Sequence, residues 1–111
     1  MNIIVIDDEA TLVDLILRFL SLLGYTGEGF NTAKEALKSE ETYECAILDF
    51  NMPVIDGRQA ADLLKEKYPG IKIIFSTGEA QNPPQLKEGE RLLRKPFKSE
   101  DLFKILREEG S

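Results

Sequence analysis

The chain has 111 residues, of which 42% are apolar, and this size suits one compact domain with an ordinary hydrophobic core. Its net charge of -6 argues against a general nucleic-acid surface and against binding to anionic membranes. The absence of histidine excludes Ser–His and Cys–His nucleophile pairs and removes the commonest zinc ligand, so any metal ion would be held by oxygen atoms.

The sequence shows no signal for export or membrane insertion. The acidic run Asp7-Asp8-Glu9 comes too early for the apolar region of a signal peptide. The longest apolar stretch, Leu12–Leu23, contains Asp14 and Arg18 and is too short to cross a bilayer. The single cysteine, Cys45, lies in an apolar run and is expected in the core. We therefore expect a cytoplasmic domain without an internal disulfide.

The first half of the chain alternates two kinds of segment. The apolar run Ile3–Ile6 predicts a strand, and Leu12–Leu23, which a glycine follows, predicts a helix. Tyr25–Phe30 predicts a second strand, and its two internal glycines favour a bulge or an edge position. The capping box Thr32-x-x-Glu35 then opens a predicted helix that ends near Ser39.

The second half continues the alternation. Predicted strands are Ala46–Leu48, Ile71–Phe75 and Leu92–Leu93, and predicted helices are Arg58–Lys67, after the Asp56-Gly57 turn, and Ser99–Arg107, capped by Ser99. Pro83-Pro84 interrupts the place between the last two strands where a helix is expected, so residues 78–89 are predicted to be a loop with at most one helical turn. Strand–helix alternation implies crossover connections, which predicts an α/β fold with a five-stranded parallel sheet.

Chemically active side chains follow four of the predicted strands. Asp7 and Asp8 follow the first, Asp49 the third, Thr77 the fourth and Lys95 the fifth. Because ligands bind at the carboxyl ends of strands in an open parallel sheet, these side chains are expected in one crevice.

Clustered carboxylates repel one another unless a cation lies among them, and oxygen ligands favour a hard divalent ion such as Mg²⁺. Lys95 and Thr77 could hold the oxygens of a phosphoryl group that the Asp49 carboxylate attacks. Two simpler interpretations stay open: Asp7-Asp8 as a helix cap and Lys95 as a plain salt-bridge partner.

The motif set resembles two-component response-regulator receiver domains. It consists of Asp7-Asp8, Asp49-x-Asn51-Met52-Pro53-x-x-Asp56-Gly57, Thr77-Gly78 and Lys95-Pro96-Phe97. The resemblance covers nearly the whole chain, with residues 1–108 as the receiver domain and 109–111 as a C-terminal tail. It implies a flavodoxin-like (CheY-like) sandwich with strand order 2-1-3-4-5, helices on both faces, and a fourth helix that is short or missing.

The resemblance also implies a role for each site residue. Asp49 would accept a phosphoryl group from phosphohistidine on a sensor histidine kinase or a histidine phosphotransfer protein. Asp8 and Asp49 would bind Mg²⁺ directly (Mn²⁺ as the alternative), the backbone carbonyl of Asn51 would be a further ligand, and Asp7 would act through water. Thr77 and Lys95 would hold the phosphoryl oxygens.

Further residues would adjust this chemistry. In the family, the positions of Asn51 and Glu79 tune the lifetime of the phosphate. Pro53 and Gly57 are expected to shape the loop after Asp49, Gly57 through its backbone freedom.

The sequence departs from the family pattern near its C-terminal half. Leu92 stands where an aromatic residue is usual, so a ring cannot report the phosphorylated state there. The segments around Thr77 and Lys95 resemble the receivers with a Phe-Ala-Thr-Gly pattern, in which the fourth-helix region is reduced. We hypothesise that phosphorylation instead orders residues 78–90.

The first predicted helix has more apolar surface than one sheet face needs. Its surplus side chains Leu12, Leu15 and Leu22, with Pro96 and Phe97, are predicted to dock the phosphodonor. An oligomer contact, or simply an apolar helix without a partner, is the alternative interpretation.

The predicted function is a phosphoacceptor switch or relay that catalyses its own phosphorylation and dephosphorylation but is not an enzyme on another substrate. The expected partners are a phosphodonor and an unidentified downstream protein, with no nucleic acid and no membrane. One alternative is a phosphate-independent pseudo-receiver that acts as a protein-binding module. Another is an aspartate-dependent phosphatase, which usually carries a second aspartate where this chain has Asn51. The length leaves no room for an output domain, so the chain is either a stand-alone receiver or part of a larger protein.

Overall fold

The computed structural model describes residues 1–78 and 84–109, and its centre is an all-parallel sheet with the order β2-β1-β3-β4-β5. The strands are β1 (Asn2–Ile6), β2 (Thr26–Phe30), β3 (Cys45–Asp49), β4 (Lys72–Thr77) and β5 (Glu90–Arg94). The helices are α1 (Ala10–Leu22), α2 (Ala33–Ala36), α3 (Gly57–Lys67) and α4 (Ser99–Glu109). The predicted strand order is confirmed.

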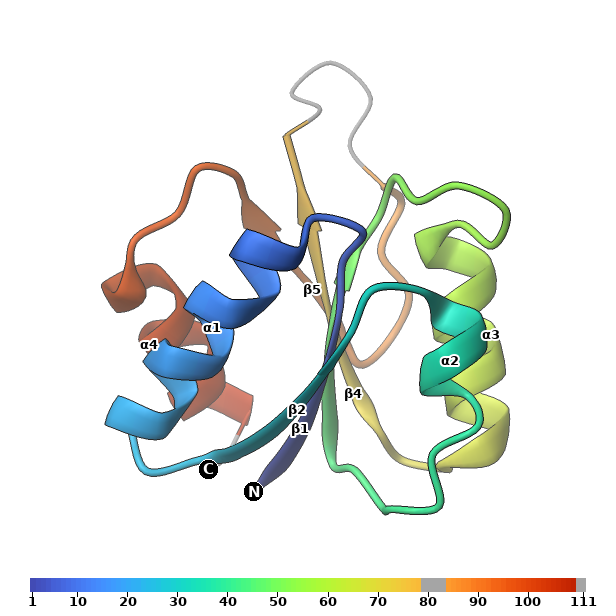
Figure 1. Ribbon diagram of the computed structural model, residues 1–111, viewed down its shortest axis with the longest axis horizontal. Helices are drawn as coiled ribbons and strands as arrows, with labels where there is room; N and C mark the ends of the chain where they lie inside the picture. The colour runs from blue at the N-terminus through green and yellow to red at the C-terminus, as the bar shows by residue number, and fades with distance from the viewer. Residues whose placement is uncertain (79–83, 110–111) are drawn as a thin grey trace.

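The helices cover both faces of the sheet. Figure 1 shows α1 and α4 on one face and α2 and α3 on the other. Each face has its own apolar cluster, one around Phe75 and Leu48 under α2 and α3, the other around Ile47 and Leu20 under α1 and α4. Because both faces are covered, every residue of β3 is buried, as is typical of a central parallel strand. The flavodoxin-like fold class predicted from the sequence is therefore confirmed.

Side-chain caps define the starts of α2 and α3. The Thr32 hydroxyl accepts the backbone N–H of Glu35 at 3.1 Å. Asp56 and Gln59 form a reciprocal capping box at the start of α3, so the predicted turn is a helix cap. The last helix begins at Ser99, as predicted, but Ser99 is not its cap. The carbonyl of Lys98, not Ser99, accepts the first helical N–H groups, and the Asp101 carboxylate accepts the N–H of Lys98 at 2.9 Å.

No helix lies between β4 and β5 within residues 78 and 84–89, in agreement with the expected reduced fourth helix. The remaining residues of that connection lie outside the described part of the chain. Within the described residues, no helix combines the length and the apolar character needed to cross a membrane.

Two glycines bring α1 close to β2, the edge strand predicted from their positions. A Cβ atom on Gly29 would lie 2.3 Å from Val13 Cγ1 and 3.0 Å from Leu17 Cδ1. A Cβ atom on Gly27 would lie 2.9 Å from Leu20 Cδ1. A side chain at Gly29 would therefore force Val13 to move, whereas a methyl group at Gly27 would require only that the ends of Leu17 and Leu20 shift.

Candidate functional site

The carboxyl ends of four strands bring the predicted site residues to one edge of the sheet. Asp49 and Thr77 are the last residues of β3 and β4, while Asp7 and Lys95 directly follow β1 and β5. The register pairs Asp49 with Ser76 and Thr77 with Arg94, which aligns these strand ends. The loops that follow β1, β3 and β5 all lie on the upper side of the sheet in Figure 1. Chain topology thus brings these side chains to one edge of the sheet, as expected from the sequence.

Three carboxylates gather at this edge. One oxygen from each of Asp7, Asp8 and Asp49 lies within 4.8 Å of the others. Asp7 and Asp49 are buried, with 1% and 6% of their surfaces exposed, whereas Asp8 is exposed. A set of carboxylate oxygens without nitrogen or sulfur donors suits a hard divalent ion such as Mg²⁺. The residues present therefore fit the metal expected from the sequence.

Lys95 supplies the positive charge beside these acids. Its Nζ atom lies 3.1 Å from Asp7 Oδ2 and 3.5 Å from Asp49 Oδ1. Although burial acts to lower the pKa of Lys95, the hydrogen bond to Asp7 and the charges of Asp49 and Asp7 raise it overall. The ammonium group therefore stays charged and forms ion pairs with both buried carboxylates.

The carboxyl group of Asp49 has a pKa well above its ordinary value. Burial and then the charge of Asp7 raise its pKa from 3.8 to about 6, while Lys95 and the N–H of Asn51 act in the opposite direction. A divalent cation bound next to Asp49 would favour its ionised form.

Asn51 contacts two of these residues. Its N–H donates to Asp49 Oδ1 at 3.2 Å, and its side-chain Nδ2 donates to Thr77 Oγ1 at 3.3 Å. Asn51 was expected in the site through its backbone carbonyl and as a tuning position, but not through this contact with Thr77. The hydrogen bond joins the loop after β3 to the end of β4. Glu79, the other tuning position, lies outside the described residues.

The loop after Asp49 is held by close packing and carries one unusual backbone conformation. The Gly57 N–H donates to the Phe50 carbonyl at 2.9 Å, and a Cβ atom on Gly57 would lie 2.5 Å from Phe50 Cα and 2.8 Å from the Asp49 carbonyl oxygen. The expectation that Gly57 serves through backbone freedom was wrong, because its φ is not positive and the requirement is one of space. Val54 has a φ of 68° and is 99% exposed.

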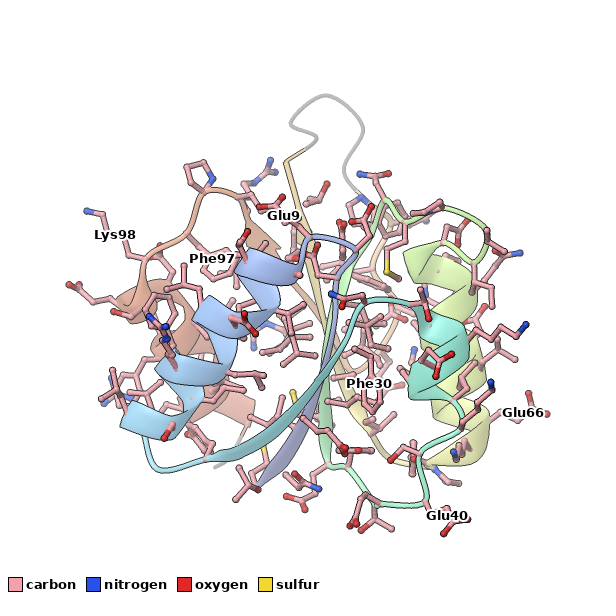
Figure 2. All side chains as sticks on the ribbon, viewed as in Figure 1. Glu9, Phe30, Glu40, Glu66, Phe97 and Lys98 are labelled. Carbon is pink, nitrogen blue, oxygen red and sulfur yellow. The ribbon has the colours of Figure 1, made fainter. Side chains whose placement is uncertain are left out.

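Four of the five predicted docking residues line one groove of about 410 Å³ beside the acids. Leu12 and Leu15 contribute from α1, and Pro96 and Phe97 from the loop after β5; Glu9 and Lys95 complete the lining. Figure 2 labels Glu9 and Phe97, which lie on the α1 side of the sheet near its upper edge. Leu22, in the last turn of α1, is 84% exposed and is not part of this groove.

Comparisons with known proteins agree with this geometry. The family model for the response regulator receiver domain matches residues 3–107. The transcriptional regulatory protein TdiR of Thauera aromatica is 32% identical over 108 residues, covering 92% of this chain and 48% of that protein. The chain thus spans about half the length of this curated relative.

Two solved structures share the fold and contain ligands at their own sites. The receiver domain of the sensor histidine kinase PA1611 from Pseudomonas aeruginosa, with a magnesium ion coordinated in the active site cleft, has a TM-score of 0.86 and 27% identity. The match covers 99% of this chain and 98% of that one. The response regulator TrrA from Thermotoga maritima, in complex with Mg(2+)-BeF, has a TM-score of 0.85, 28% identity and 97% coverage of both chains. By sequence and by structure, this chain belongs to the response regulator receiver domain family.

Proposed function

We propose that Asp49 is the residue that accepts a phosphoryl group when this receiver domain acts in two-component signalling. The observation that carries the proposal is the joint placement of three carboxylates within 4.8 Å of one another and of Lys95 Nζ 3.5 Å from Asp49 Oδ1. A receiver without phosphate chemistry, the pseudo-receiver alternative, would need neither the buried acids nor the lysine between them. The upstream partner is a protein that carries phosphohistidine, on a sensor histidine kinase or a histidine phosphotransfer protein.

The reaction transfers a phosphoryl group from nitrogen to oxygen. An oxygen of the Asp49 carboxylate attacks phosphorus, the O–P bond forms, and the P–N bond breaks with its electron pair left on the imidazole. Lys95 and Thr77 hold the equatorial phosphoryl oxygens and stabilise their negative charge. Water later attacks the phosphorus atom, the bond between phosphorus and the Asp49 oxygen breaks, and inorganic phosphate leaves, which regenerates the carboxylate. The domain thus catalyses its own phosphorylation and dephosphorylation and acts on no other substrate.

Magnesium, with manganese as the alternative, would supply charge neutralisation at the transferred group. Asp8, Asp49 and the backbone carbonyl of Asn51 would hold it, with Asp7 acting through water. The same acids bind the metal and place the nucleophile, so metal binding and phosphorylation depend on one cluster.

The mass of the intact protein after incubation with acetyl phosphate tests the acceptor. With Mg²⁺ present, the wild type is expected to gain the mass of one phosphoryl group, and Asp49→Asn is expected to gain none. Asp56→Asn is the matched control, because Asp56 lies in the same loop as a helix cap and asparagine caps equally well. No gain in the wild type with acetyl phosphate and with several phosphohistidine donors would favour the pseudo-receiver.

The groove beside the site is proposed to dock the phosphodonor. Leu15→Asp should slow transfer from a phosphohistidine protein by about tenfold or more while leaving labelling by acetyl phosphate unchanged, since a buried charge would oppose an apolar contact. Leu22→Asp is the matched control on the same helix, outside the groove, and should leave both rates unchanged. If Leu22→Asp slows transfer as much as Leu15→Asp, the groove is not the docking site. Equal losses in both assays would indicate misfolding.

A further inference from the structure

A buried ion cluster lies outside the phosphorylation site. Glu90, the first residue of β5, has a side chain with 0% exposure. Arg58 donates to both of its oxygens, at 2.6 and 2.9 Å, and Lys65 donates to one of them at 2.5 Å. The backbone N–H of Lys87 donates to Glu90 Oε1 at 2.7 Å. One carboxylate therefore collects four hydrogen bonds from α3 and from the chain just before β5.

The same arginine fixes the segment that precedes β5. We call residues 84–89 the strap. Arg58 Nη2 donates to the Gln85 carbonyl at 2.8 Å, and Lys87 Nζ lies 3.6 Å from Asp62 Oδ1 on α3. Pro84, at the start of the strap, is buried. The strap thus lies against α3.

Arg58 is also tied to the loop that carries Asp49. It directly follows Gly57, which packs against the Phe50 backbone. Its guanidinium carbon lies 5.0 Å from the centre of the Phe75 ring, and that ring meets Phe50 edge-on, with centroids 5.3 Å apart. The acceptor loop, the start of α3 and the strap therefore form one packed unit.

The cluster resists opening because of its charge. Burial acts to raise the pKa of Glu90, but the hydrogen bonds from Arg58, Lys65 and Lys87 lower it to about 2, so the carboxylate is ionised at neutral pH. Removing the strap from α3 would break the bond from Lys87 and leave a buried charge with fewer partners, which is strongly unfavourable.

We propose that Arg58 and Lys65 clamp the strap to α3 through Glu90, and that this clamp keeps the strap and the start of β5 in place whether or not Asp49 is phosphorylated. The second half of the inference rests on the proposed function. The clamp is a built-in limit on the conformational response, because a change that starts at Thr77 cannot reach β5 through the strap. The hypothesis that phosphorylation orders all of residues 78–90 is thereby restricted, since residues 84–90 are already fixed.

Amide exchange of Lys87, followed by NMR on the full chain, tests the clamp because this N–H donates to Glu90 Oε1. The Lys87 exchange rate is measured with and without Mg²⁺ and beryllofluoride, a mimic of the phosphoryl group. ¹⁹F resonances of protein-bound beryllofluoride verify that the site is loaded. In the wild type, loading should change the Lys87 exchange rate by less than about threefold. In unloaded Arg58→Lys the rate should rise by more than about threefold, since one ammonium cannot reach both carboxylate oxygens and the Gln85 carbonyl.

Arg91→Lys is the matched control, because it is also an arginine-to-lysine change and lies next to Glu90 in β5. Arg91 pairs with Glu108 on α4 and not with Glu90. Arg91→Lys should leave Lys87 exchange unchanged. The clamp would be overturned if loading changed the Lys87 exchange rate of the wild type by more than about threefold. It would also be overturned if the Lys87 exchange rate of unloaded Arg58→Lys stayed within about threefold of the wild-type rate. If Arg58→Lys does not fold, Lys65→Gln is judged by the same threshold. Absence of bound-fluoride resonances would count against the proposed function, and the clamp would then be decided by the unloaded variants.

Discussion

The left-handed backbone at Val54 gives a stability prediction that can be worked out from the structure. Val54 has a φ of 68°, a region in which a β-branched residue crowds its own backbone. This conformation costs about 1–2 kcal/mol for a residue with a branched Cβ. Because the side chain is 99% exposed, its removal loses almost no apolar contact.

Asparagine tolerates this backbone region, and glycine adopts it without strain. Val54→Asn should therefore raise the free energy of unfolding by about 1 kcal/mol. Val54→Gly should raise the free energy of unfolding by only about 0.5 kcal/mol, because the greater freedom of glycine in the unfolded chain offsets part of the relief of backbone strain. For a domain of this size, 1 kcal/mol corresponds to a rise in Tm of about 4–8 °C.

Urea unfolding followed by circular dichroism measures both gains, and Val54→Thr is the control. Threonine keeps the branched Cβ, so its stability should equal that of the wild type within about 0.3 kcal/mol. If Val54→Asn is no more stable than wild type, or if Val54→Thr gains as much, strain at this position is not the cause and the reasoning is refuted.

Three further predictions concern buried groups. The pKa of Asp49 in the folded protein is raised from 3.8 to about 6, so the metal-free protein should lose about 2 kcal/mol of stability as pH rises from 4 to 6. Asp49→Asn should abolish this loss, and urea unfolding across that pH range measures it. The pKa of Glu90 in the folded protein is lowered from 4.5 to about 2, so its contribution to the free energy of unfolding is present above pH 4.5 and is lost as pH falls toward 2. Glu90→Gln should lower the free energy of unfolding by about 3 kcal/mol at pH 7. A difference in stability between variant and wild type that stays constant down to pH 2 would contradict this. Gly57→Ala should destabilise by about 2 kcal/mol, since its Cβ would meet backbone atoms of Phe50. Thermal unfolding compares it with Gly78→Ala, whose Cβ would meet nothing within 4 Å and which should not destabilise.

Local patterns in the sequence were enough to predict the sheet and the position of the site. Apolar runs and helix signals alternate in the chain, and the rule for parallel sheets then places Asp7, Asp49 and Lys95 at one edge. The caps at Thr32 and Asp56 were also predictable, because each side chain bonds a backbone group three residues away.

Features that depend on close approach between distant segments could not be read from the sequence. The pair Arg58 and Glu90 is separated by 32 residues, and no local pattern matches one charge with the other. The requirement for glycine at position 57 comes from the neighbouring Phe50 backbone and not from a turn type. The side-chain bond from Asn51 to Thr77 depends on how the loop after β3 folds over the end of β4.

The close seating of α1 on β2 has a consequence for recognition. Gly27 and Gly29 leave room for Val13, Leu17 and Leu20 against the strand, so the helix packs directly on the backbone of β2. A surface that is already in its binding shape loses little conformational entropy on association. If the phosphodonor docks at the proposed groove beside α1, this seating would make the fit and charge of the groove residues decide between partners.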